Sequence, residues 1–84
     1  MDQRIYILET IRLMQVALDD PLMTTSLDRI SSTVAHTAPE IISQRWTEIF
    51  LFCKQWVQDG ENPKHMECFK IYHERLKGYK ELSD

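Results

Sequence analysis

Hydrophobic residues recur along most of the chain at the three- and four-residue spacing of an α-helix. The first such stretch covers residues 2–19. Asp2 can cap it, and it should end where Asp19 and Asp20 precede Pro21, because a residue before proline avoids the helical region. Its apolar side chains form two stripes on roughly opposite sides of the helix. One stripe is Ile7, Ile11, Met14 and Leu18, and the other is Tyr6, Leu13 and Ala17 with Ile5 and Val16. A helix with two apolar sides is normally packed between partners, so this pattern points to a homodimer.

Three further helices are predicted, over residues 26–36, 38–58 and 63–79, and the last of them either ends near Gly78 or continues, frayed, to Leu82. The helix over 26–36 is expected to be short and marginal, because its apolar stripe is narrow and its serines and threonines are poor helix formers. That stripe consists of Leu27, Ile30 and Val34, with Met23 leading into it. Thr25 and Asp28 are spaced like a weak capping box at its start. Residues 19–25 are expected to form a loop.

Stronger signals delimit the last two helices. Thr37 can cap the third, Pro39 suits its first turn and Glu40 completes a capping box, while Gly60 provides a left-handed cap at its end. The shared apolar face comprises Ile42, Trp46, Ile49, Phe50, Cys53, Trp56 and Val57, extended by Phe52 and Ile41. Leu51 points away from it. Asn62 and the proline after it can start the fourth helix, whose apolar face comprises Cys68, Phe69, Tyr72, Leu76 and Tyr79.

The whole chain, residues 1–84, is therefore predicted to be a single helical domain of the all-α class. Only two glycines and three prolines occur, whereas small β-proteins need many tight turns. The expected architecture is a small bundle of about four helices, either alone or as an intertwined or side-by-side homodimer. The dimer is expected to form through the first and third helices.

Charge and cysteine usage narrow the functional class. Ten basic residues stand against thirteen acidic ones, giving a net charge of −3. Nucleic-acid binders normally carry a basic excess on one face, so this balance argues against that class. The two cysteines, Cys53 and Cys68, both fall inside helical patterns and do not resemble a secreted disulfide framework. The longest apolar run, residues 49–53, is far shorter than the roughly 20 residues that span a bilayer. A cytoplasmic protein that does not act on membranes is expected.

The sequence contains only weak candidates for a catalytic or metal-binding site. Asp28, Ser32 and His36 share one strip of a helix, but the serine lies between the other two, and a catalytic triad needs the histidine between the acid and the serine. His65 and Cys68 could share a metal, yet no established metal-binding motif supports them. No glycine-rich phosphate loop is possible with two glycines eighteen residues apart. We therefore expect no enzyme, no cofactor and no metal.

The remaining signal is an excess of apolar and aromatic side chains over what one small core needs. Such residues on surplus faces are typical of protein interfaces. The sequence thus favours a protein that binds another protein, as an adaptor, a regulator or inhibitor, or a small secretion-type chaperone. The candidate partner-binding residues are Trp46, Phe50, Leu51, Trp56, Leu13 and Tyr6.

The alternative is a regulator that associates with nucleic acid. Basic residues of the last helix alternate with aromatic ones, an arrangement that can bind single strands. They are Lys70, Arg75, Lys77 and Lys80. Residues 27–46 also loosely resemble a helix-turn-helix, with Ile30, Ala35 near the turn and Ile41 opening the second helix. The resemblance implies a second helix in the major groove. This segment departs from the pattern at His36 and Gln44 and carries only two basic residues, Arg29 and Arg45.

Overall fold

A computed structural model describes residues 3–57 and 61–83. Four α-helices and one short 3-10 helix occupy almost all of this part of the chain, which contains no strand. In order, they are α1 (Gln3–Leu18), α2 (Pro21–Ala35), η1 (Pro39–Gln44), α3 (Arg45–Trp56) and α4 (Pro63–Ser83). The prediction of an all-α bundle of four helices is confirmed.

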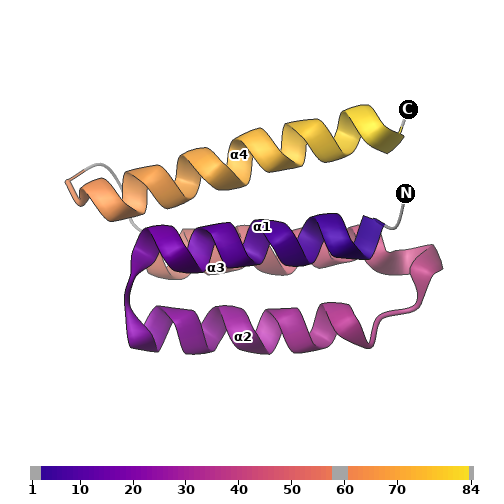
Figure 1. Ribbon diagram of the computed structural model, residues 1–84, viewed down its shortest axis with the longest axis horizontal. Helices are drawn as coiled ribbons and strands as arrows, with labels where there is room; N and C mark the ends of the chain where they lie inside the picture. Colours follow the sequence, from indigo (N-terminus) through magenta and orange to yellow (C-terminus); the bar gives the residue numbers. More distant parts are fainter. Residues whose placement is uncertain (1–2, 58–60, 84) are drawn as a thin grey trace.

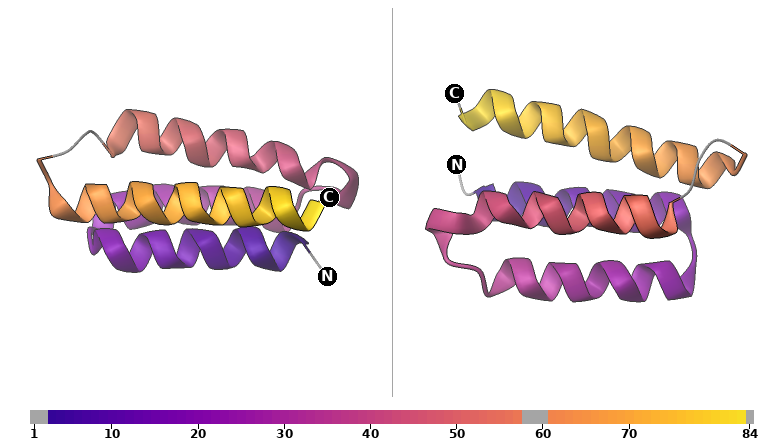
Figure 2. Two further views of the ribbon diagram at one scale, coloured as in Figure 1. Left: turned by 90° about the horizontal axis from the view of Figure 1, so that it is seen from above. Right: turned by 180° about the vertical axis from the view of Figure 1, so that it is seen from behind.

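The four helices form a bundle in which α1 and α3 lie between α2 and α4. In Figure 1, α1 lies in front of α3, with α4 above the pair and α2 below it. Seen from above, α4 runs over the line between α1 and α3 (Figure 2). The packing is uneven, because α4 rests chiefly on α1 and touches α3 much less. The α1–α4 pair therefore carries most of the attachment of the last helix.

The core is continuous through the bundle and takes side chains from every helix. The stripe predicted for α1 is confirmed: Ile7, Ile11, Met14 and Leu18 are all buried. The other buried hydrophobic residues are Leu27, Val34, Ile42, Trp46, Ile49, Phe52, Cys53, Val57, Cys68, Tyr72 and Tyr79. The second stripe of α1 behaves differently, since Ile5, Leu13 and Val16 are exposed. The described part of the chain leaves these three residues uncovered, whereas Tyr6 and Ala17 of the same stripe are half-buried.

The start of the second helix was predicted too late. Residues 19–25 are not a loop, because α2 begins at Pro21. Asp20 caps it, accepting hydrogen bonds from the backbone N–H groups of Leu22 and Met23 at 3.0 and 3.1 Å. Pro21 takes the first helical position, where its missing N–H costs nothing. The Asp-Asp-Pro segment thus ends one helix and starts the next within two residues.

The third helix is also divided differently from the prediction. Its first turns, Pro39–Gln44, are a 3-10 helix, and regular α-helix begins at Arg45. Thr37 does not cap it, because the Thr37 hydroxyl donates to the carbonyl oxygen of Thr33 at 2.6 Å. The residue at the cap position is Ala38, whose side chain can form no hydrogen bond. Without a polar cap, the tighter 3-10 geometry satisfies the first backbone groups.

The fourth helix starts as predicted and ends later. The Asn62 side chain accepts a hydrogen bond from the backbone N–H of Lys64 at 2.9 Å, and Pro63 opens the helix. The helix does not end near residue 79 but continues through Gly78 to Ser83. The predicted caps at Asp2 and Gly60 lie outside the described residues.

Candidate protein-binding surfaces

A groove of about 470 Å³ lies between α2 and α3. Its apolar lining comes from Ile30 on α2 and from Leu51, Phe52 and Trp56 on α3. Ile30 and Trp56 are half-buried and Phe52 belongs to the core, whereas Leu51 is 52% exposed. The groove therefore has a packed floor and one projecting apolar side chain, as in surfaces that accept a side chain from a partner.

Charged and polar groups border this groove. Arg29, Glu48 and Gln55 lie along it, and Glu48 accepts a hydrogen bond from the Arg45 guanidinium at 2.6 Å through its Oε1 atom. The second carboxylate oxygen of Glu48, Oε2, is buried without a hydrogen-bond partner among the described residues. An acceptor without a donor is costly when desolvated. The Nε atom of Arg45 is likewise buried without a partner in the described part of the chain, so this ion pair forms one hydrogen bond where two are possible, and Oε2 itself is not open to the groove.

The six predicted partner-binding residues do not form one surface. Leu51 and Trp56 meet in the groove. Phe50, which was placed on the core face, is 44% exposed and turns towards α4, with its ring centroid 6.5 Å from that of Tyr72. Leu13 is exposed on α1. The remaining two are not free surface residues: Trp46 is buried in the core, and Tyr6 is packed between α1 and α4.

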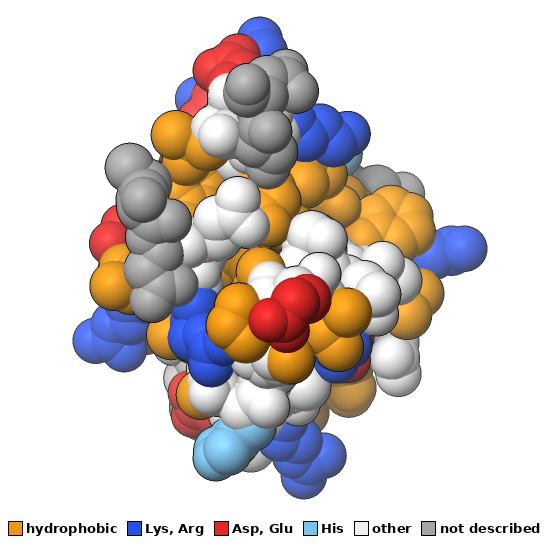
Figure 3. Space-filling view, turned by 90° about the vertical axis from the view of Figure 1, so that its right-hand side faces the viewer, with side chains coloured by type: hydrophobic (Ala, Val, Ile, Leu, Met, Phe, Trp, Pro, Cys, Tyr) orange, Lys and Arg blue, Asp and Glu red, His pale blue; other side chains and the backbone are white. Residues whose placement is uncertain are grey.

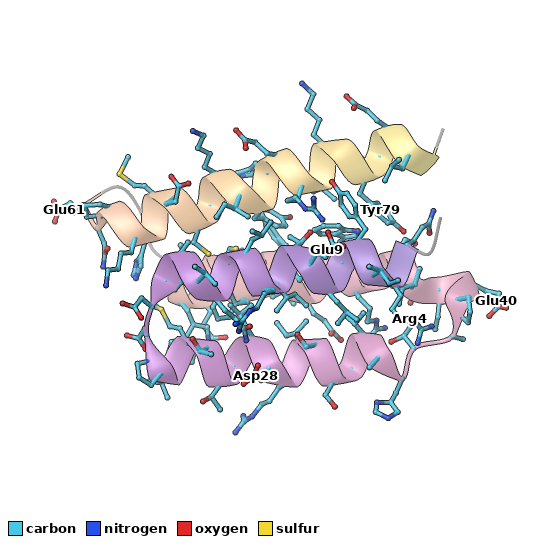
Figure 4. All side chains as sticks on the ribbon, in the orientation of Figure 1. Arg4, Glu9, Asp28, Glu40, Glu61 and Tyr79 are labelled. Carbon is cyan, nitrogen blue, oxygen red and sulfur yellow. The ribbon has the colours of Figure 1, made fainter. Side chains whose placement is uncertain are left out.

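A cluster of polar and cation–π contacts joins α1 to α4, with Tyr6 at its centre, and the sequence did not predict it. The Arg75 guanidinium lies 3.7 Å from the Tyr6 ring centroid. It also donates to the Thr10 hydroxyl and to the Tyr6 carbonyl oxygen, at 2.9 and 3.0 Å. Glu9 completes the cluster, with a carboxylate oxygen 3.5 Å from the Arg75 guanidinium, on the side of α1 nearest α4 (Figure 4). The partners lie about 65 residues apart in sequence, so no local spacing signals this cluster.

The predicted basic residues of α4 are divided by this cluster. The Arg75 side chain contacts Tyr6, Thr10 and Glu9. The other three, Lys70, Lys77 and Lys80, are exposed. Lys70 and Lys77 lie four residues before Glu74 and Glu81, respectively, and residues at that spacing are neighbours on a helix surface. The outer face of α4 therefore mixes both signs of charge.

In the segment resembling a helix-turn-helix, the residues at the start of the second element form η1 rather than an α-helix. Arg45 forms an ion pair with Glu48, and Ile41, which opens the second element, is 42% exposed. At the end of the bundle that holds η1, hydrophobic side chains are interrupted by polar, acidic and basic ones, so both signs of charge are present on this face (Figure 3).

The candidate catalytic and metal-binding residues do not come together in one site, and each makes its own local contacts. Asp28 accepts a hydrogen bond from the Gln15 amide at 2.7 Å, and a ring nitrogen of His36 lies 2.9 Å from the carbonyl oxygen of Ser32. His73 stacks on Phe69 with ring centroids 5.5 Å apart. Within residues 3–57 and 61–83, no three histidine, cysteine, aspartate or glutamate side chains converge as a metal site.

The two cysteines meet between α3 and α4. Both are fully buried and free. The hydrogen bond with Cys68, together with burial, raises the pKa of the Cys53 thiol far above its usual range. Burial likewise raises the pKa of Tyr72 and of Tyr79. A thiol held neutral in this way is a poor nucleophile and metal ligand, and it packs as a small hydrophobic residue.

None of the described helices has the length and apolar character needed to cross a membrane. No protein-family model, curated protein or solved structure matches the chain.

Proposed function

We propose that the protein binds another protein through the α2–α3 groove, accepting one amphipathic helix of the partner. The observation that carries this proposal is Leu51, which is 52% exposed beside the half-buried Trp56 and Ile30. An amphipathic helix buries apolar side chains at positions i and i+4 in such a groove. The adaptor, regulator and chaperone roles expected from the sequence all require a surface of this kind.

The chemistry of the rim specifies the partner further. Glu48, whose side chain is 36% exposed on the rim, favours a partner helix with a lysine or arginine next to its apolar anchors, because its Oε1 atom can accept a second hydrogen bond beside that from Arg45. Arg29, on the α2 side of the groove, disfavours a second basic residue there. We place this activity in the cytoplasm, which the two free thiols support.

Site-specific photo-crosslinking tests the groove directly. A photoreactive amino acid at Gln55, on the rim, should give a crosslinked protein adduct in host lysate. The adduct should disappear when Leu51→Glu is added, since a buried carboxylate would disrupt the apolar contact. The matched control places the same photoreactive residue at Lys70, on the outer face of α4, where no such adduct should form.

Two results would contradict the proposal: adducts at Gln55 that Leu51→Glu leaves unchanged, or adducts that consist of nucleic acid. Because Leu51 is exposed, Leu51→Glu should keep the helical circular dichroism spectrum and the unfolding midpoint of the parent protein. Loss of the adduct can then be attributed to the surface and not to unfolding. Once the partner is known, exchanging the basic residue of its helix for glutamate should weaken binding at least about tenfold, because Glu48 would face a like charge.

A further inference from the structure

The outer face of α1 carries an exposed apolar residue at each end and is left uncovered by the described part of the chain. Ile5 is 55% exposed and Val16 is 66% exposed. In Figure 1, α1 is the nearest helix to the viewer, and α2 and α4 lie below and above it without crossing in front. The α2–α3 groove is built from other helices. A partner on this face of α1 would therefore not compete for the lining of the groove.

The residues along this face are spaced like the seam of a coiled coil. Residues 5, 9, 12 and 16 are separated by four, three and four positions, which is the heptad spacing of residues that face a second helix. The sequence along the seam is Ile5, Glu9, Arg12 and Val16. All four are exposed. Apolar residues thus occupy the two ends of the seam, and opposite charges occupy its middle.

This order is complementary to itself when two copies run antiparallel. If the pairs are centred between residues 10 and 11, Ile5 lies opposite Val16 of the second copy. Glu9 then lies opposite Arg12 of the second copy, and two-fold symmetry repeats both pairs. A parallel pair would instead place Glu9 against Glu9 and Arg12 against Arg12, which is repulsive. The charge pattern therefore selects both the occupant, a second copy of this chain, and its direction.

The charged residues are available for this pairing. Arg12 is exposed and has no ion-pair partner in the described part of the chain. Glu9 contacts Arg75 at 3.5 Å, yet its side chain remains 62% exposed and its carboxylate has two oxygens. It can accept from Arg75 of its own chain and from Arg12 of the second copy together. Charged residues at seam positions fix register and orientation at a cost in affinity.

We propose that two copies associate weakly through an antiparallel pair of α1 helices, with Ile5 against Val16 and Glu9 against Arg12. The sequence led us to expect a dimer through the first and third helices, whereas this geometry uses α1 alone. One helix seam is small compared with stable interfaces, so the dissociation constant should fall in the micromolar range or above. The dimer would present two α2–α3 grooves, and it does not depend on the function proposed for them.

Sedimentation equilibrium of charge-reversal variants tests the register. The wild-type chain should dimerise as its concentration rises towards about 1 mM. Arg12→Glu alone and Glu9→Arg alone should each weaken self-association at least about tenfold, because each places like charges in contact twice. An equimolar mixture of the two variants should regain wild-type affinity, since every contact in the mixed dimer pairs opposite charges. Lys70→Glu, on the outer face of α4, is the control that should change nothing.

Circular dichroism shows whether each variant is folded. Glu9→Arg could disturb the cluster around Arg75, so a second measurement keeps the test independent of it. Ile5→Cys mixed with Val16→Cys should form a crosslinked mixed dimer under mild oxidation, faster than either variant alone. A chain that stays monomeric at 1 mM, or a dimer unaffected by Arg12→Glu, would overturn the proposal. A dimer abolished by Leu51→Glu would also overturn it and would assign self-association to the groove.

Discussion

Three contacts join Tyr6 and Arg75, one of which is the hydrogen bond from the Arg75 guanidinium to the Tyr6 carbonyl oxygen. The Arg75 guanidinium covers the Tyr6 ring at 3.7 Å, and the Tyr6 hydroxyl donates to the Arg75 carbonyl oxygen at 2.6 Å. The first residue lies in α1 and the second in α4, 69 positions later. Together with the Tyr79 hydroxyl, which donates to the Gln3 side chain at 3.0 Å, this pair forms a polar connection between the last helix and α1, the helix on which α4 chiefly rests.

Arg75→Ala should destabilise the fold by about 2–3 kcal/mol, because it removes the cation–π contact and leaves the buried Thr10 hydroxyl without a donor. Arg75→Lys should recover only part of this loss, since lysine cannot cover the ring and donate to Thr10 at once. Urea unfolding followed by circular dichroism measures both variants. Equal stability of the lysine variant and the wild type would show that charge alone matters.

Gly78→Ala should destabilise the protein, although alanine normally stabilises a helix interior by about 1 kcal/mol relative to glycine. A Cβ at this position would lie 2.5 Å from the Tyr6 hydroxyl oxygen. That oxygen cannot move freely, because it is bonded to the Arg75 carbonyl and its ring lies under the guanidinium.

The sign of the Gly78→Ala effect should reverse when the Tyr6 hydroxyl is removed. In a Tyr6→Phe background, the nearest remaining atom, Cζ, lies 3.6 Å from the new Cβ, which is an ordinary contact. Gly78→Ala should then stabilise the protein by about 1 kcal/mol. A double-mutant cycle of urea unfolding curves checks this, and additive effects would disprove the proposed steric conflict.

Stability should fall at alkaline pH. The folded-state pKa of Cys53 is raised from its ordinary value of 9.0, so the folded chain keeps this proton when the unfolded chain loses it. The contribution is fully present below pH 9 and is lost progressively as the pH rises above it. The pKa values of Tyr72 and Tyr79 are also raised, from 10.0, so these two residues add a further loss of stability at higher pH.

Urea midpoints measured between pH 7 and pH 10 would show this decline, by the linkage between proton binding and folding. In Cys53→Ala, the urea midpoint should change less with pH near pH 9. Its decline near pH 10, which comes from the two tyrosines, should persist. The Cys53 thiol should also resist iodoacetamide in the folded protein and react after urea is added. A thiol alkylated at the same rate in both states would contradict the buried pair.

Asp20→Ala should cost about 1 kcal/mol, because two backbone N–H groups of α2 lose their acceptor. The neighbouring Asp19 provides a matched control. It has a positive φ of 48°, which asparagine tolerates, and its side chain is 84% exposed in an ion pair 3.7 Å from Lys64. Asp19→Asn should therefore change the unfolding midpoint little. A larger effect at Asp19 than at Asp20 would show that α2 does not begin where the structure places it.

The sequence predicted the helical class and the main buried stripes, because helix periodicity is a local property. Ile7, Ile11, Met14 and Leu18 were identified in this way. It failed at the start of α2 because Pro21 can either follow a helix or open one, and a single proline carries both signals. It also placed Phe50 on the core face, whereas the structure leaves Phe50 exposed. The light packing of α4 against α3, which decides this exposure, is a tertiary property that no spacing along α3 encodes.

The candidate site was predictable only in part. Leu51 was expected to project and Trp56 to be an anchor, and they do lie together, but Ile30 joins them only through the packing of α2 on α3. Trp46 shares the residue type of an interface anchor and yet is buried, since burial depends on what the rest of the chain covers. The contacts of Arg75 likewise required the whole topology.

The pairing of α1 with α4 has a consequence for how the chain folds as it is synthesised. Among the described helices, α4 is the last to leave the ribosome, and the partners of Arg75 are near the other end of this part of the chain. Helices α1, α2 and α3 can pack together beforehand. Tyr6 and Thr10 can form their contacts with the Arg75 guanidinium only after α4 has been synthesised. Contacts between such distant positions form slowly, because the chain must first lose the entropy of closing the intervening segment. A nascent chain stalled before Arg75 should therefore expose the face of α1 that α4 later covers, at the moment when a second nascent copy or a chaperone is closest.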